Sequence, residues 1–301
     1  MGRDSTPGIL QHPDPRAWRS HRFGLPSDRW ERLRGNSFWV TGAGTGYGRC
    51  IAIALAAAES QVFLTGRRRE KLEETRAEAA ALGIDPAGCI AVPADITRPD
   101  EIRQAADVIA QHTDRLFGLV NNAALPEPRP GPWPLSDLGA EQWNALLATN
   151  VTGQWLVSQA ALPLLAQGHG FRMVFMSSEA GWAFTPGFGP YNASKAAVNS
   201  LGASFAAECA ARYLDKDVQI NVLVPGEART EMNRGSTESP WSVVNMTLLL
   251  LSYPAGGPNG CFFHRDGRHL GFGHAGSYAQ SLAPTGLLRN LLGKWLAPRR
   301  G

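Results

Sequence analysis

The sequence predicts an α/β fold in a single domain, built on a doubly wound parallel β-sheet flanked by helices on both faces. Short apolar segments, rich in β-branched residues, alternate from residue 37 onward with longer segments rich in Ala, Leu, Glu and Arg. A glycine-rich turn joins the first apolar segment to the first helical one. The chain of 301 residues, 44% hydrophobic and 18% charged, has enough apolar material for one such core. Together these observations indicate a Rossmann-like fold.

The alternation defines the expected elements in order. Six segments have the length and composition of buried parallel strands: 37–41, 61–65, 89–93, 116–121, 172–176 and 219–224. The segments between them with helical composition are 49–58, 69–82, 100–111, 141–165 and 193–213. After Pro225, a polar loop at 226–240 precedes an apolar helix at 241–251 and a last expected strand at 261–263. Because long loops in compact domains are usually functional, we expect the 226–240 loop to act as a lid.

The same pattern divides the chain into three parts. One folded domain is expected at 35–275, after an N-terminal extension, 1–34, and before a C-terminal tail, 276–301. We expect the extension to be a tether or an arm that packs on a neighbouring subunit. In the tail, an apolar stripe with basic flanks predicts an amphipathic helix; the stripe consists of Leu287, Leu288, Leu291, Leu292, Trp295 and Leu296. The helix is expected to pack on the body or a sister subunit, with a membrane-surface helix as the alternative.

Composition and charge argue against several classes of function. The formal net charge is +3 with no long basic tract, so we expect no nucleic-acid partner. The four cysteines form no CxxC pair, and residues 1–15 lack the apolar core of a signal peptide, which indicates a cytoplasmic protein. No apolar run approaches the ~20 residues that span a bilayer, so membrane association is not expected. The spacing of His264, His269 and His274 fits no compact metal site, and no metal is expected.

The glycine-rich turn after the first strand predicts a dinucleotide site. A strand, a turn with the spacing TGxxxGxG and a helix follow one another in the required order. Glycines let backbone N–H groups approach a pyrophosphate, and the helix N-terminus adds partial positive charge. The cofactor-binding residues expected here are Gly42, Gly44, Thr45, Gly46, Tyr47 and Gly48.

The end of the second strand predicts which dinucleotide binds. NAD-binding folds commonly place a carboxylate there for the ribose 2′-hydroxyl, whereas this chain has Arg67, Arg68 and Arg69. A guanidinium can hold a 2′-phosphate through two charge-assisted hydrogen bonds. We therefore expect NADP(H) to be favoured over NAD(H), with Arg67 as the first ligand and Arg68 as the second. The alternative is that these arginines only solvate the start of the next helix.

Polar residues also follow the third and fourth strands, at the edge where such sheets bind ligands. Asp95 can accept a hydrogen bond from the adenine amine. Asn121 can donate and accept at once, so it either bridges backbone groups beneath the cofactor or is purely structural. The cofactor-binding candidates at these strand ends are Asp95, Ile96, Asn122 and Ala123.

The residues after the fifth strand carry the expected chemistry. Tyr191 and Lys195 are four residues apart, so on a helix they project from one face. A nearby ammonium lowers the pKa of a phenol from its usual ~10, which suits Tyr191 to act as general acid in reduction and general base in oxidation. Ser178 can donate to the same substrate oxygen, and Asn150 can hold a water next to Lys195. This constellation predicts hydride transfer between a nicotinamide and a carbonyl or alcohol.

These motifs resemble the short-chain dehydrogenase/reductase family, in its single-domain form, over residues 35–273. The glycine motif, Asn-Asn-Ala, a helical Asn, a Ser and Tyr-x-x-x-Lys occur in the family's order. Ser178 stands thirteen residues before Tyr191, as is usual in that family, which favours it over Ser177. Two residues depart from the family pattern without removing a needed group: Tyr47 replaces a small aliphatic residue, and Ala124 replaces a glycine.

The resemblance implies further roles. Lys195 would bind the nicotinamide ribose hydroxyls as well as tune Tyr191. The segment with Pro225, Gly226 and Thr230 would flank the nicotinamide carboxamide. The family likeness also implies a homodimer or homotetramer, assembled through the helices that contain Asn150 and Tyr191, with a monomer as the less favoured state.

Three functions are compatible with these residues. The first is a carbonyl reductase or alcohol dehydrogenase, whose substrate is open among oxoacyl thioesters, polyketide-like ketones, steroids and sugars. The second is an epimerase or dehydratase of a nucleotide-sugar, but the TGxxGxxG spacing of such relatives and a large second domain are absent from the sequence. The third is a non-catalytic NADP-binding regulatory protein, which would be expected to lack Ser178, Tyr191 or Lys195, and all three are present.

Three loops, 125–134, 179–190 and 226–240, are expected to form the substrate pocket. Aromatic residues in or next to these loops favour an apolar or ring-containing substrate: Trp133, Trp182, Phe184, Phe188 and Trp241. The equal alternative is that these side chains pack loops or subunits.

Overall fold

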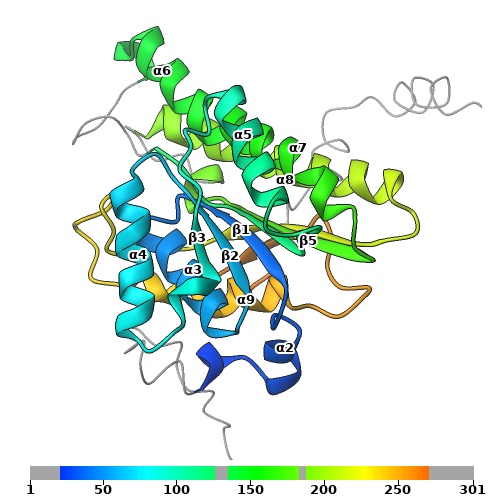
Figure 1. Cartoon of the computed structure of the whole chain (residues 1–301). Coiled ribbons are helices and arrows are strands. Elements are labelled where there is room, and N and C mark those ends of the chain that lie inside the picture. Colours follow the sequence, from blue (N-terminus) through cyan, green and yellow to red (C-terminus); the bar gives the residue numbers. More distant parts are fainter. Residues whose placement is uncertain (1–20, 126–134, 183–187, 271–301) are drawn as a thin grey trace, which may run out of the picture. The chain divides into compact units, whose positions relative to one another are not determined.

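The computed structural model describes residues 21–125, 135–182 and 188–270, and these residues confirm the α/β fold. They form a seven-stranded sheet in the order β3-β2-β1-β4-β5-β6-β7, in which every neighbouring pair is parallel (Figure 1). The strands are β1 (Ser37–Thr41), β2 (Gln61–Thr65), β3 (Cys89–Ala91), β4 (Gly118–Asn121), β5 (Gly170–Met176), β6 (Asp217–Val224) and β7 (Phe262–His264). The strand order reverses between β1 and β4, so their carboxyl ends form the switch point at which doubly wound sheets bind ligands.

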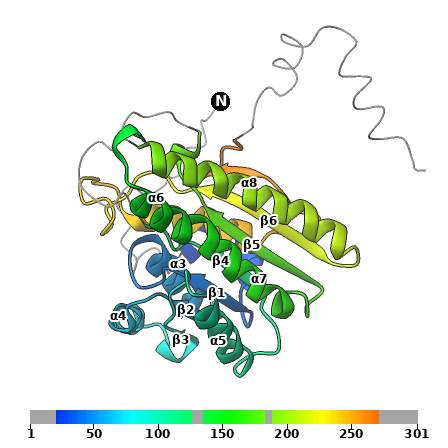
Figure 2. The same cartoon turned by 90° about the horizontal axis from the view of Figure 1, so that it is seen from above.

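Helices cover both faces of the sheet, as Figures 1 and 2 show. One face carries α3 (Gly46–Ala57), α4 (Arg69–Ala81) and α9 (Val244–Leu251). The other face carries α5 (Pro99–Ala110), α7 (Gln154–Leu165) and α8 (Gly189–Arg212). The shorter helices are α2 (Ser27–Glu31), α6 (Ala140–Leu147) and the 3-10 turns Arg22–Gly24, Pro86–Gly88, Leu135–Asp137, Glu179–Gly181 and Pro240–Val243.

Near the carboxyl ends of the strands, buried polar side chains of the sheet are paired by hydrogen bonds. Trp39 is fully buried, and its Nε1 donates to Thr65 Oγ1 at 2.8 Å. The Thr65 hydroxyl in turn donates to the Val92 carbonyl at 3.0 Å. Since buried polar groups are costly when unpaired, this chain of bonds ties β1, β2 and the end of β3 into one edge.

The helix expected at 141–165 is interrupted by a π-helical turn, Ala148–Gly153, between α6 and α7. Asn150 lies in this turn, and its side chain bonds both the N–H and the carbonyl of Leu125. Gly153 packs against Ile96 so closely that a Cβ there would lie 2.7 Å from the isoleucine side chain. These contacts come from distant parts of the chain, which explains why local periodicity predicted an unbroken helix.

The described end of the expected N-terminal extension packs on this domain itself. Phe23 is fully buried and its ring stacks on Trp241, with centroids 5.6 Å apart. The Asn245 side chain donates to the Phe23 carbonyl at 2.8 Å, and Arg29 donates to the Ser252 carbonyl at 2.8 Å. The boundary expected at residue 34 therefore does not separate two packing units, because apolar residues before it complete the core beneath α9.

Several expectations lie outside the described residues: the tail helix, the loop tip at 126–134, and Trp133, Phe184 and His274. The described residues up to His269 form one compact unit. Within the described part of the chain, no helix has the length and apolarity needed to cross a membrane. The same part holds no cluster of three or more His, Cys, Asp or Glu side chains suited to a metal.

Candidate active site

The glycine turn between β1 and α3 has a backbone and a close packing that favour glycine. Gly46 has φ of +53°, a left-handed conformation that other residues rarely take. A Cβ on Gly48 would lie 2.3 Å from the Gly42 carbonyl oxygen. Thr45 precedes α3 in an extended conformation, so the unpaired N–H groups of the first helical turn follow it directly. The turn thus has the backbone geometry of an anion-binding helix N-terminus.

Two side chains brace this turn from either side. Arg49 donates to the Gly44 carbonyl from Nε at 3.0 Å and from Nη2 at 2.5 Å. Asn122 Nδ2 donates to the carbonyls of Thr41, at 2.9 Å, and Gly42, at 3.3 Å. The predicted cofactor residue Asn122 therefore shapes the turn. Without its side-chain amide, the Thr41 and Gly42 carbonyls would lose this hydrogen-bond partner.

A cavity of about 1360 Å³ opens along the carboxyl edge of the sheet. It extends from the glycine turn and the arginines after β2 to the end of β5 and the first turns of α8. The predicted site residues that line it are Gly42, Gly44, Thr45, Gly46, Tyr47, Arg67, Arg68, Asp95, Ile96, Asn122, Ala123, Ser178, Tyr191, Lys195, Pro225, Gly226 and Thr230. Gly48 and Asn150 do not line it, because Gly48 packs within the turn and Asn150 is fully buried behind the cavity wall.

The two arginines predicted for a 2′-phosphate have different surroundings. Arg68 Nη2 lies 2.6 Å from Oε2 of Glu231, which belongs to the loop after β6. Arg67 is exposed and lines the same cavity, and within the described residues it forms no ion pair. Lys71, in the first turn of α4, also lines this end and binds both carboxylate oxygens of Glu74 at 2.8 and 2.9 Å. Lys71 was absent from the sequence prediction, because Arg67 lies before the helix and no helical spacing links the two residues.

The strand-end candidates separate into cavity and core residues. Asp95 lines the cavity, and its Oδ1 accepts from the N–H and the hydroxyl of Thr97 at 2.9 and 2.8 Å. Asn121 is fully buried and donates to Ser158 Oγ at 2.7 Å. Of the two alternatives for Asn121, the structural one therefore fits its position.

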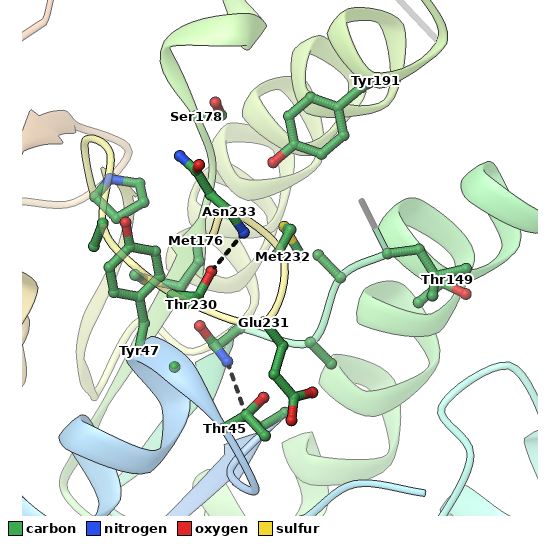
Figure 3. A pocket seen from close by; sticks show the side chains of 18 of the residues that line it. Thr45, Tyr47, Thr149, Met176, Ser178, Tyr191, Thr230, Glu231, Met232 and Asn233 are labelled. Atoms are coloured by element: carbon green, nitrogen blue, oxygen red, sulfur yellow. Dashed lines mark hydrogen bonds between the residues drawn. The ribbon is translucent and has the colours of Figure 1, made fainter. Parts of the chain in front are cut away.

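The chemical end of the cavity is formed by β5 and α8. Pro190 stands in the first turn of α8, where its missing N–H leaves no bond unmade, so the helix begins before Tyr191. Figure 3 shows the Tyr191 hydroxyl directed into the cavity, with Ser178 and Asn233 around the same end. The predicted pair Tyr191 and Lys195 thus lies on one helix, with Lys195 Nζ 5.6 Å from the centre of the Tyr191 ring.

Ser178 and Ser177 have distinct partners. Ser178 Oγ accepts from the Ala180 N–H at 3.2 Å, which occupies a lone pair and leaves the hydroxyl hydrogen able to donate into the cavity. Ser177 is buried and donates to Asn199 Oδ1, so its hydroxyl hydrogen is already used. This geometry agrees with the choice of Ser178 over Ser177.

Lys195 is an almost fully buried cation in the wall of the cavity. Its residue is 2% exposed, and Nζ donates to the Met176 carbonyl at 2.9 Å. Burial lowers the pKa of Lys195 from 10.5 to about 8, because desolvation disfavours the ammonium form. At neutral pH the ammonium still predominates, so a positive charge lies beside Tyr191.

Asn150 is joined to α8 through one hydroxyl. Its Nδ2 donates to the Leu125 carbonyl and to Ser194 Oγ, both at 3.1 Å. Ser194 Oγ donates to the Tyr191 carbonyl at 2.8 Å. Both amide hydrogens of Asn150 are therefore used on Leu125 and Ser194, which gives its side chain a bracing position, and the water expected beside Lys195 stays a prediction.

Tyr47 joins the glycine turn to the segment after β6. Its hydroxyl donates to the Gly226 carbonyl at 2.8 Å. Burial raises the pKa of the Tyr47 phenol well above its ordinary value, and Arg265 only partly opposes this effect. Tyr47 therefore stays protonated at neutral pH.

Of the aromatic residues expected to line a substrate pocket, Phe188 lines the main cavity. Trp182 packs edge-on against Phe262, with ring centres 5.7 Å apart, and Trp241 stacks on Phe23. The packing alternative thus describes Trp182 and Trp241. The cavity end near Tyr191 is lined instead by Met232 and Asn233 of the 226–240 loop, which the sequence pattern did not single out.

Comparisons with known proteins agree with this architecture. A family model for short chain dehydrogenase matches residues 36–241. The chain is 35% identical over 205 residues to 11-beta-hydroxysteroid dehydrogenase 1A of Arabidopsis thaliana, covering 68% of this chain and 56% of that protein. A solved short chain dehydrogenase from Salmonella enterica serovar Typhi has a TM-score of 0.71 at 28% identity, over 80% of this chain and 99% of that chain. Another from Escherichia coli CFT073, complexed with NADPH, has a TM-score of 0.70 at 26% identity, over 78% and 98% of the two chains.

The chain therefore belongs to the short-chain dehydrogenase/reductase family, as its motifs predicted. The match spans just over half the length of the Arabidopsis protein, at 56%. It covers almost the whole of the two solved structures, at 99% and 98%.

Proposed function

We propose that this protein is an NADP(H)-dependent oxidoreductase that interconverts a carbonyl and a secondary alcohol by hydride transfer. The observation that carries the proposal is the shared cavity: Ser178, Tyr191 and Lys195 line one end, and the glycine turn and Arg67 line the other. A proton donor and a dinucleotide cradle thus open on one space of about 1360 Å³, which is large enough for a cofactor and a small substrate together. The names of the relatives, a hydroxysteroid dehydrogenase among them, support this reaction class.

The residues at the adenine end fit a dinucleotide with a 2′-phosphate. Arg67 offers a guanidinium that forms no ion pair within the described residues, and the four residues directly after β2 include no carboxylate to accept from a ribose 2′-hydroxyl. The structural neighbour complexed with NADPH supports the same preference. When bound, the nicotinamide supplies the hydride in reduction and accepts it in oxidation.

Residues of the chain bind the oxygen on the reacting carbon and exchange a proton with it. Ser178 donates a hydrogen bond that polarises the carbonyl. Tyr191 gives its phenolic proton to the oxygen in reduction and takes it back in oxidation. The Lys195 ammonium, 5.6 Å from the Tyr191 ring centre, stabilises the phenolate that remains after the proton leaves.

Asn150 acts in this proposal as a positioning residue. The bonds from Asn150 through Ser194 to the Tyr191 carbonyl hold the first turn of α8 in place. These bonds keep the Tyr191 hydroxyl within hydrogen-bonding distance of a substrate oxygen. Such positioning matters because small displacements of a reacting group slow the reaction strongly.

We also propose a homodimer or homotetramer located in the cytoplasm. Trp155 on α7 is 40% exposed, which gives the helix next to the π turn an apolar outer surface suited to a subunit contact. The four cysteines are free thiols, in keeping with a reducing compartment. Light scattering on the purified protein tests the assembly, and a monomer at all concentrations would contradict it.

The first experiment is a titration of the purified protein with NADPH and NADH, followed by a panel of ketones and aldehydes monitored through NADPH absorbance. We expect tighter binding of NADPH and its consumption on some members of the panel. Failure to bind either nucleotide would contradict the proposed function.

Arg67→Ala tests the cofactor preference separately. Because a charge-assisted contact to phosphate is lost, we expect NADPH binding to weaken roughly ten- to hundredfold while NADH binding changes little. The matched control is Arg69→Ala, at an exposed position in the next turn that does not line the cavity. Equal losses for NADPH and NADH would remove Arg67 from the role of reading the 2′-phosphate.

A further inference from the structure

The loop after β6 is fixed at its base by residues from other elements. Arg265, which follows β7, donates to the Glu227 carbonyl at 2.9 Å and to Ser242 Oγ at 2.7 Å. The Arg229 N–H donates to the Glu238 carbonyl at 2.7 Å. The Arg265 guanidinium thus bonds both ends of the loop, and the Arg229–Glu238 backbone bond crosses it. These bonds hold the base of the loop at the edge of the sheet, and the residues between them form the loop tip.

The loop tip, residues 230–236, lines the cavity, and its first two residues, Thr230 and Glu231, lie at the nucleotide end. A Cβ on Gly46 would lie 3.0 Å from the Thr230 side chain, so the tip touches the glycine turn. Glu231 and Thr45 line the same cavity, and Figure 3 shows both. Within the described part of the chain, one ion pair joins the tip to the rest of the domain, and it is the 2.6 Å contact between Glu231 and Arg68.

This ion pair is placed where a ligand can displace it. The side chains of Arg68 and Glu231 are 52% and 45% exposed, and an exposed ion pair contributes little net stability. Arg68 lies next to Arg67, the residue proposed to read the 2′-phosphate. A phosphate monoester carries nearly two negative charges near neutral pH, against one for a carboxylate, so it is the stronger partner for the same guanidinium.

We propose that Glu231 is a specificity-determining residue that competes with the 2′-phosphate of the cofactor for Arg68. Binding of NADP(H) exchanges the carboxylate for the phosphate and releases the loop tip from the nucleotide end of the cavity. NAD(H) has a 2′-hydroxyl in that position and leaves the ion pair in place. The inference rests on the proposed preference for NADP(H), because it concerns the same arginines.

The test compares two nucleotides that differ only in the 2′-phosphate: adenosine 2′,5′-bisphosphate and adenosine 5′-monophosphate. Their binding to the full-length protein is measured by calorimetry at low ionic strength, for wild type and for Glu231→Gln, which removes the charge and keeps the side-chain shape. We expect Glu231→Gln to bind the bisphosphate about two- to fivefold more tightly, the range set by loss of an exposed ion pair, and the monophosphate unchanged. In an Arg68→Met background the gain should vanish, and added salt should shrink it.

Glu227→Gln is the matched control, since it removes one negative charge from the same loop without removing the partner of Arg68. An equal gain in Glu227→Gln, or an equal gain for both nucleotides, would show a general field effect and overturn the proposal. If wild type prefers the bisphosphate but Glu231→Gln binds it no more tightly, the proposal is overturned and the cofactor preference stands. Equal binding of both nucleotides by wild type would overturn the preference and this inference together.

Discussion

Lys195 holds a charge that is almost fully buried at the edge of the cavity. Its Nζ donates to the Met176 carbonyl, and burial lowers the pKa of the amine to about 8. Between this pKa and the ordinary 10.5, the unfolded chain still binds a proton that the folded chain has released. The free energy of unfolding therefore rises with pH through this window, and the buried ammonium destabilises the fold below pH 8.

This reasoning predicts the pH dependence of Lys195→Met. We expect the free energy of unfolding of wild type, relative to the variant, to increase by about 2 kcal/mol between pH 7 and pH 9.5. Urea unfolding of both proteins at the two pH values measures the difference, and other alkaline groups cancel because both proteins share them. A difference that does not change with pH would mean that Lys195 keeps its ordinary pKa.

Removing the Tyr191 hydroxyl separates the residue's part in cofactor binding from its part in proton transfer. Tyr191→Phe removes the proton donor and keeps the ring, so we expect NADPH affinity to stay within a few fold of wild type. Turnover should fall by a factor of about 100 or more, the usual contribution of a general acid. Tyr47→Phe is the control, because it removes a phenol that stays protonated and bonds the Gly226 carbonyl. Near-normal turnover in Tyr191→Phe would exclude it as the acid.

At the scale of elements, β5 and β6 are joined by a buried ion pair at their amino ends. Arg172 Nη2 lies 2.6 Å from Asp217 Oδ2, and the arginine side chain is 4% exposed. Burial raises the pKa of Asp217, but hydrogen bonds from Gly256 and Gln219, together with Arg172, outweigh burial and lower it overall. The stability that this carboxylate contributes is present above its unfolded pKa of about 4 and is lost as the pH falls through the lower folded value.

Asp217→Asn should therefore destabilise the domain by about 2 kcal/mol or more at pH 7, because it leaves a buried guanidinium without its counter-charge. The loss should shrink as the pH falls below about 4, where wild type also loses the charge. Chemical unfolding across this pH range measures both effects. Glu31→Gln, in an exposed pair with Arg34, is the control and should change stability by less than about 1 kcal/mol. Similar losses in the two variants would contradict the argument.

The elements also show how far sequence reasoning reaches. Strands β1 and β2 have the predicted bounds, because each has three consecutive apolar residues between polar residues and a glycine follows each strand. Helix α8 begins at Gly189 rather than near residue 193, since its Gly-Pro start is not an amphipathic pattern. The motif residues Ser178, Tyr191 and Lys195 were found because their spacing is local and their order is typical of a family.

Other parts of the site depend on contacts that spacing does not encode. Arg265 bonds residues 23 and 38 positions away, and Glu231 pairs with a residue 163 positions away. Each is an ordinary charged residue in a polar loop, so no local pattern marks it. The bracing role of Asn150 has the same origin, because its partners Leu125 and Ser194 lie on other segments.

At the scale of the whole domain, the described N-terminal residues pack against α9 and its flanking residues on one face of the sheet. Phe23 and Trp241 are 218 residues apart in sequence and stack with an interplanar angle of 2°. Arg29 bonds the Ser252 carbonyl and lies 4.2 Å from the centre of the Tyr253 ring. Trp241 stands at the end of the 226–240 loop, so the N-terminal segment supports the base of the loop that covers the cavity.

Phe23→Ala tests this connection. Removing a fully buried aromatic side chain should lower the free energy of unfolding by about 3–5 kcal/mol, measured by urea unfolding. Because Trp241 loses its stacking partner, the KM for the carbonyl substrate should rise more than the Kd for NADPH. Arg34→Ala, in the same segment but with an exposed side chain, is the control and should leave both constants near wild type. If Phe23→Ala changed stability alone, the segment would complete the core without supporting the loop.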